Sequence, residues 1–580
     1  MEEDTMFLLN KDKKDSFDES DVRCLLVSKT SCKKSFKRYN LLILLASFIA
    51  SLGGILFGYD IGIISGAMLQ LRVEFNLSCL QQEMVVSSLL LGGLIGSLTG
   101  GFLLDRFGRK IVIIMNAFFY IIGGLTLTFS GSYSILLIGR FIVGFAVALS
   151  AVSDCVYISE IAPMKRRGSL VSLNEFGITI GILLAYLTSF LLITKKDGWR
   201  YMFGISCLPA ALQAFVMFFL PESPRWLLIN GQEKKAQIVI TKLWPNCNLA
   251  NELNNLNKSL ECEQNYKFMD LFSSKENLCM RMIIGCGVIF FQQLSGQPTI
   301  IYYAPSLFQS LGFSSHVSSS LVTVGLGIVK VVFTFVSLCF IDKLGRRKLL
   351  LLGAIIMTLS VITLSVVTEP FQNVKIQKSC GNDQVLTIKK TCFNKSINFH
   401  QNFSSLVNQS KLDDSKRILI QDYLNCKNTN FVSNYPVAIR YTCLFALMLF
   451  VIGYAVGYGP VTWLLLTEIF PTGIKGRAAA VATSLNWGTN IILSMAFLDM
   501  IDKLGPFYIF LMYALIGVVS IIFIYHIVPE TKFKSLESIS FELSKSFINC
   551  SERKMLLVES EHNVTKKEIS DNTEFAQETV

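Results

Sequence analysis

Twelve segments of about twenty predominantly apolar residues recur along this chain of 580 residues. A helix of that length is enough to cross the hydrocarbon core of a bilayer. Charged residues make up 16% of the chain, against about 25% in soluble domains, and the mean hydropathy is +0.49. Such a chain cannot bury its apolar side chains in soluble cores, so we expect a polytopic membrane protein. The predicted spans are 41–67, 84–104, 111–129, 134–156, 169–193, 201–220, 282–303, 320–341, 349–367, 438–462, 479–500 and 506–528.

The spans divide into two groups of six, which predicts an all-α membrane protein with two six-helix halves. The expected divisions are a polar tail at 1–40, a first half at 41–220, a linker at 221–280, a second half at 281–528 and a tail at 529–580. Within the linker, residues 232–243 and 250–260 favour helices; a flexible linker is the alternative. The first tail lacks the apolar core of a cleaved signal peptide, so both tails are expected in the cytosol.

Basic residues and glycosylation sequons fall in opposite sets of loops. Lysine and arginine clusters follow spans two, four and eight, as expected of cytosolic loops, and they explain the net charge of +11 without nucleic-acid binding. The other side carries a long loop at 369–436, in which Cys380, Cys392 and Cys426 offer one disulfide. The four histidines form no ligand cluster, so no metal site or cofactor is expected. The predicted glycosylation sites are Asn76, Asn394, Asn402 and Asn408.

Three short motifs occur once in each half. Asp105-Arg-Phe-Gly-Arg-Lys is repeated as Asp342-Lys-Leu-Gly-Arg-Arg, Glu160-Ile-Ala-Pro as Glu468-Ile-Phe-Pro, and Pro221-Glu-Ser as Pro529-Glu-Thr. In each half, the second motif precedes the third by 61 positions. The distance from the first motif to the second is 71 positions longer in the second half than in the first. The excess locates an insertion between spans nine and ten. Two parallel six-helix halves are the architecture of the major facilitator superfamily, with the substrate near the midplane.

The repeated charges predict a latch at the cytosolic mouth. Glycines allow a tight turn between spans, so that Arg109 and Arg346 can reach Glu160 or Glu468 and close the mouth in one state only. The alternative is that these charges only fix the topology. The full predicted set of gate salt bridges comprises Arg109, Glu160, Arg167, Arg346, Glu468, Lys475 and Arg477.

Further motifs give the chain a specific resemblance over nearly all of residues 40–535. They include Pro221-Glu-Ser-Pro-Arg-Trp, Gln292-Gln-Leu-Ser-Gly, Tyr302-Tyr, Gly459-Pro and Asn486-Trp. With these motifs the chain resembles the sugar porter family, which includes the facilitative glucose transporters. The long loop between spans nine and ten is similar to that of the member-twelve type. The resemblance implies transport of a hexose, glucose first, by alternating access.

Side-chain chemistry agrees with a sugar cargo. Amides both donate to and accept from sugar hydroxyls, and an indole covers a sugar's apolar C–H face. The resemblance implies that Gln292, Gln293, Asn490 and Trp463 line the sugar site, although each alone could serve as a contact between helices. Gln297, beside Pro298, and Glu175 stand at positions of the same pocket.

Asp60, Glu175 and Lys330 are ionisable residues inside predicted spans, where charge is costly and commonly functional. Proton symporters of the family carry an aspartate at the position of Asp60. We hypothesise that Asp60 binds and releases a proton and that Lys330 is compensated by Glu175 or Asp60. The alternative is a static ion pair in a plain uniporter.

Two acidic dileucine patterns predict endocytic adaptors as partners and shuttling between the plasma membrane and endosomal or perinuclear membranes. The other partners expected are the sugar, a proton and the lipid bilayer. A proton-coupled inositol or polyol carrier, an exporter of amphiphiles and a sugar sensor without transport are the alternatives, and no enzyme motif is found. The sorting residues are Leu25, Leu26, Leu556 and Leu557.

Overall fold

A computed structural model describes residues 41–163, 167–245, 249–251, 253–254, 256–257, 268–273, 277–310, 316–369, 436–471 and 474–532. The described part is helical and contains no strand. It has twelve segments long and apolar enough to cross a membrane, which confirms the predicted number of spans. Most spans extend a few residues beyond the predicted ends.

The first half consists of seven helices, two of which share one span. Its sixth span is interrupted at Ile205 and Ser206, between α8 and α9. The helices are α3 (Leu41–Glu74), α4 (Cys79–Phe107), α5 (Arg109–Thr128), α6 (Tyr133–Ile161), α7 (Arg167–Leu192), α8 (Gly198–Gly204) and α9 (Cys207–Phe219).

The second half repeats this order with two interrupted spans. Gly296, with a φ of 86°, separates α13 from α14, and Gly457 separates α19 from α20. The helices are α13 (Leu278–Leu294), α14 (Gln297–Ser310), α15 (His316–Leu344), α16 (Arg346–Thr368), α19 (Val437–Val456), α20 (Tyr458–Ile469), α21 (Lys475–Leu504) and α22 (Pro506–Ile527).

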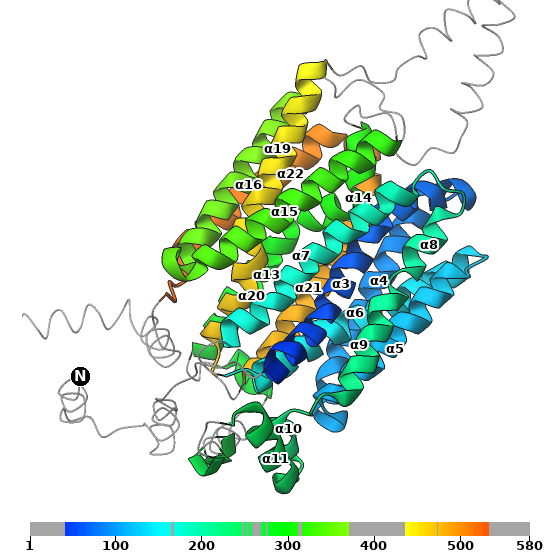
Figure 1. The fold of residues 1–580 in the computed structure, drawn as a ribbon. Helices are drawn as coiled ribbons and strands as arrows, with labels where there is room; N and C mark the ends of the chain where they lie inside the picture. Colours follow the sequence, from blue (N-terminus) through cyan, green and yellow to red (C-terminus); the bar gives the residue numbers. More distant parts are fainter. Residues whose placement is uncertain are drawn as a thin grey trace, which may run out of the picture.

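Between the halves lie α10 (Pro224–Ile229), α11 (Glu233–Leu243) and the 3-10 helix η3 (Phe268–Phe272). Helices α10 and α11 lie beyond the end of the bundle where α3 begins and α9 ends (Figure 1). Helix α11 confirms the first helix expected in the linker. The second, at 250–260, falls partly outside the described residues.

Small residues allow the helices of each half to approach closely. A Cβ on Gly58 would lie 1.9 Å from the carbonyl oxygen of Ile178, and one on Gly144 would lie 1.9 Å from that of Leu89. Glycine at these positions permits the backbone contacts between α3 and α7 and between α4 and α6. The two halves meet where α4 packs on α21, α7 on α15 and α3 on α14. The predicted sugar and proton residues come from these helices and their neighbours.

Candidate functional site

The predicted sugar-site amides are buried in the second half. Gln292 on α13 is 2% exposed, and its Nε2 donates to the hydroxyl of Tyr454 at 3.2 Å and to the carbonyl of Tyr458 at 2.9 Å. Its Oε1 has no hydrogen-bond partner among the described residues, and neither has Oε1 of the adjacent Gln293. An unpaired buried acceptor is costly, so both amides offer an acceptor to a hydroxylated ligand.

Asn490 on α21 belongs to the same region through Tyr302. Its Nδ2 donates to the Tyr302 hydroxyl at 3.1 Å, and its Oδ1 accepts from the Ser494 hydroxyl at 3.3 Å. Gln297 is buried at the start of α14, whereas Trp463 is half-buried on α20 against the apolar core. Five of the six predicted sugar-site residues therefore come from α13, α14, α20 and α21 of the second half, whereas Glu175 lies on α7 of the first half.

Asp60 lies on α3 and is 1% exposed, and both of its carboxylate oxygens lack a partner among the described residues. Its cationic neighbour is Arg140 on α6, which lies within electrostatic range of Asp60 and of Tyr302. The guanidinium donates to the backbone carbonyl of Asp60 at 3.3 Å. Arg140 thus connects the predicted proton site with Tyr302 and, through it, with Asn490.

Glu175 on α7 and Lys330 on α15 lie within electrostatic range of each other across the two halves, and each is the main charged neighbour of the other. The Lys330 ammonium also lies 5.3 Å from the ring centre of Tyr454, within range of a cation–π interaction. The same tyrosine accepts the hydrogen bond from Gln292. Lys330 is therefore opposed by Glu175 rather than by Asp60, and the pair lies beside the amide cluster.

At one end of the first half, residues of the predicted gate are joined by an ion pair and hydrogen bonds. The Arg109 guanidinium is paired with Glu160 at 2.9 Å, and the same carboxylate accepts from the Ser223 hydroxyl. Gly108 has a φ of 91°, which lets the backbone N–H groups of Arg109 and Lys110 donate to Glu222 at 3.1 and 3.0 Å. Burial raises the pKa of Glu222, and these N–H donors oppose the shift.

The second half has an equivalent cluster. Arg346 is paired with Glu468 at 2.9 Å, and Thr531 donates to Glu468 at 2.6 Å. The backbone N–H of Arg346 donates to Glu530 at 2.9 Å after Gly345, which has a φ of 97°. Each described pair joins an arginine to the glutamate of its own half. The sequence left the choice between Glu160 and Glu468 open, and it missed the roles of Glu222 and Glu530.

The remaining predicted residues are partly within the described region. Lys475 is half-buried and Arg477 exposed at the start of α21, and both make interactions. Asn76 is exposed with a φ of 50°, in the turn between α3 and α4. Outside the described residues lie the side chain of Arg167, the other three predicted glycosylation sites Asn394, Asn402 and Asn408, and the sorting residues Leu25, Leu26, Leu556 and Leu557.

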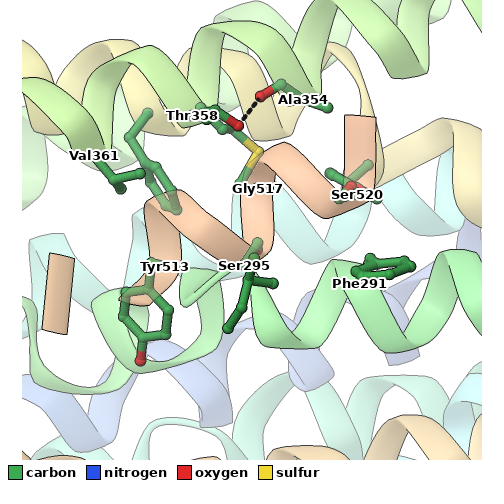
Figure 2. A pocket seen from close by; sticks show the side chains of 12 residues that line it. Phe291, Ser295, Ala354, Thr358, Val361, Tyr513, Gly517 and Ser520 are labelled. Atoms are coloured by element: carbon green, nitrogen blue, oxygen red, sulfur yellow. Dashed lines mark hydrogen bonds between the residues drawn. The ribbon is translucent and has the colours of Figure 1, made fainter. Parts of the chain in front are cut away.

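A separate small cavity lies inside the second half, lined by α13, α16, α19, α20 and α22 (Figure 2). Its volume of about 10 Å³ holds roughly one water molecule. Ser295, in its wall, donates to the Gln292 carbonyl at 2.7 Å. The cavity thus lies directly behind the amide cluster and is too small for a sugar.

The count of three ionisable residues in the spans was too low. Arg140 and Asp154 are buried in α6, and Glu83 is fully buried in α4, one residue before the predicted start of that span. Asp154 lies within a predicted span and could have been identified from the sequence, whereas Glu83 lies just outside the predicted start of its span. Cys79, also unforeseen, is disulfide-bonded.

Comparison with known proteins gives a consistent result. The family model described as "Sugar (and other) transporter" matches residues 46–388 and 424–543. The solute carrier family 2 facilitated glucose transporter member 12 of Homo sapiens is 38% identical over 86% of this chain and 85% of its own length. Member 10 of Xenopus laevis is 37% identical over 87% and 94%. Among solved structures, the proton:xylose symporter XylE bound to 6-bromo-6-deoxy-D-glucose has a TM-score of 0.66 and 27% identity, covering 87% of this chain and 99% of that one.

Proposed function

The chain belongs to the sugar transporter family of the major facilitator superfamily, and from this premise we propose that it moves a hexose, glucose first, by alternating access. The observation that carries the proposal is the pair of unpaired amide acceptors on Gln292 and Gln293, in the half that also carries Asn490 and its hydrogen bond to Tyr302. A sugar hydroxyl can donate to each acceptor, which removes the cost of leaving it unpaired.

We also propose that uptake is coupled to protons through Asp60. The support is that its buried carboxylate oxygens have no partner among the described residues, while Arg140 lies close enough to respond to its charge. Burial of an unpaired carboxylate favours its neutral form. A related protein of the same fold is described as a proton:xylose symporter. A uniporter with static buried charges is the competing mechanism.

The cellular setting forms the last part of the proposal. We place both termini in the cytosol, glycans at Asn76, Asn394, Asn402 and Asn408, and the protein at the plasma membrane and endosomal membranes. The basic clusters beside the Arg109 and Arg346 motifs support this orientation.

The substrate is tested by uptake of labelled glucose, galactose, fructose and myo-inositol in a cell line without endogenous sugar transporters. We expect saturable glucose uptake that unlabelled hexoses inhibit. Saturable inositol uptake that hexoses do not inhibit would favour the polyol carrier instead. Specific sugar binding without uptake of any compound would favour a sensor.

A further inference from the structure

Glu83 joins the two halves of the molecule at one end of the bundle. It lies on α4 in the first half, and its side chain is fully buried. Its Oε1 accepts hydrogen bonds from the backbone N–H groups of Leu498 at 2.8 Å and Asp499 at 3.1 Å, both on α21 in the second half. Its Oε2 has no partner among the described residues. A carboxylate that accepts backbone N–H groups makes hydrogen bonds roughly twice as strong as neutral ones.

The partner segment of α21 is held from its own half as well. In a regular helix the N–H of Leu498 donates to the carbonyl of Ser494. Here that carbonyl accepts from the hydroxyl of Tyr303 on α14 at 3.4 Å, and the Tyr303 ring stacks on Phe497 at 5.2 Å. Tyr303 itself has non-helical backbone angles inside α14. Glu83 of α4 and Tyr303 of α14 therefore bind the donor and the acceptor that a regular helix would pair at this point of α21.

The contact of Glu83 and Tyr303 with residues 494–499 of α21, here called the joint, is connected to the candidate sugar site by hydrogen bonds. The Ser494 hydroxyl donates to Asn490, and Asn490 donates to Tyr302, the neighbour of Tyr303. Glu83 lies near the start of α4, whereas the Arg109 cluster follows the end of the same helix. The joint is thus at the opposite end from the gate clusters, the extracellular end in the proposed orientation.

We propose that Glu83 is a positioning residue that holds the extracellular end closed. It does so by accepting hydrogen bonds, across the two halves, from the backbone N–H groups of Leu498 and Asp499 on α21. When the halves separate at this end, the carboxylate must release both N–H groups. Movement of Asn490 around a bound substrate reaches the joint through Ser494. The hydrogen bonds of Glu83 therefore set how much time the transporter spends closed at this end.

A thiol placed beneath the joint reports its opening. Ser87 follows Glu83 by one helical turn on the same face of α4, is 5% exposed, and its hydroxyl has no partner among the described residues. The S87C variant is treated on intact cells with a membrane-impermeant thiol reagent. Labelling is normalised to surface protein and corrected with the parent chain. We expect E83A to raise the labelling rate at least tenfold, and E83Q, which keeps an acceptor oxygen, to stay within threefold.

Gln82 supplies the matched control. It is buried beside Glu83, but its Nε2 donates to Leu77 within the first half at 3.0 Å. Q82A should leave the labelling of S87C unchanged. Equal labelling with and without E83A, or an equal rise in Q82A, would overturn the proposal. If E83A does not reach the surface, Y303F decides: it keeps the ring and should raise labelling about threefold, and no rise refutes the joint. This readout does not depend on which compound is transported.

Discussion

Replacing Asp60 with asparagine separates proton-coupled transport from facilitated transport. The two side chains have nearly the same shape, so D60N preserves the packing of a residue that is 1% exposed. Arg140 donates to the backbone carbonyl of Asp60, and that hydrogen bond survives the substitution. The variant therefore removes the site that binds a proton while leaving the path of the sugar intact.

The expected accumulation of sugar follows from one proton carried by Asp60 in each transport cycle. A pH difference of one unit is worth about 1.36 kcal/mol per proton, so one proton per sugar supports roughly tenfold accumulation per unit. With a gradient of about two units, the parent protein in proteoliposomes should accumulate a non-metabolised hexose up to about 100-fold. D60N should reach a ratio near one while equilibrium exchange of labelled sugar continues.

Asp154 provides the control for this experiment. It is also a buried carboxyl of the first half, but its Oδ2 accepts from Ser150 at 2.5 Å. D154N should keep gradient-driven accumulation. Full accumulation by D60N would refute the role of Asp60. A parent protein that only equilibrates the sugar would refute coupling altogether, without touching the assignment of sugar transport.

Three further outcomes follow from the described contacts. N490L should raise the KM for hexose about tenfold, the cost of roughly one hydrogen bond, and zero-trans uptake measures it; an unchanged KM would place Asn490 outside the sugar site. E468Q, which breaks the Arg346 pair at 12% and 16% side-chain exposure, should lower stability by about 2 kcal/mol, seen as a lower Tm in detergent, whereas K503A in an exposed pair should not; equal Tm values would contradict this. K330M should impair folding and transport more than the double variant K330M/E175Q, because it leaves the half-buried Glu175 without its cation; additive losses would exclude the pairing.

The number of spans and the fold were predictable because both depend on composition and repetition. A bilayer allows only helices or closed barrels to cross it, so apolar segments of helix length determine the architecture. A helix break was expected at Gly459-Pro460, whereas the interruption lies two residues earlier, at Gly457. The interruption at Gly296 was not predicted, because a glycine that ends a helix and one that permits close packing look alike in sequence. The contact of Glu83 with the second half also escaped prediction, because its Oε1 accepts from backbone N–H groups, which every residue type except proline carries.

The repeat itself separates two kinds of charge. Counted from the repeated Asp105 and Asp342 motifs, Glu83 corresponds to Ser320 and Lys330 to Gly93; counted from Glu160 and Glu468, Glu175 corresponds to Thr483. The charges present twice form the arginine–glutamate clusters, and each described arginine–glutamate pair joins two residues of the same half. Glu83, Glu175 and Lys330 occur once, and each interacts with the opposite half. A motif that both halves carry can be satisfied by the fold that both halves share, whereas these three unrepeated charges have partners across the halves. Asp60 also occurs once, but its charged neighbour is Arg140 of its own half. Alternating access requires interactions that form and break between the halves, so Glu83, Glu175 and Lys330 are the charges to test first for a role in the transport cycle.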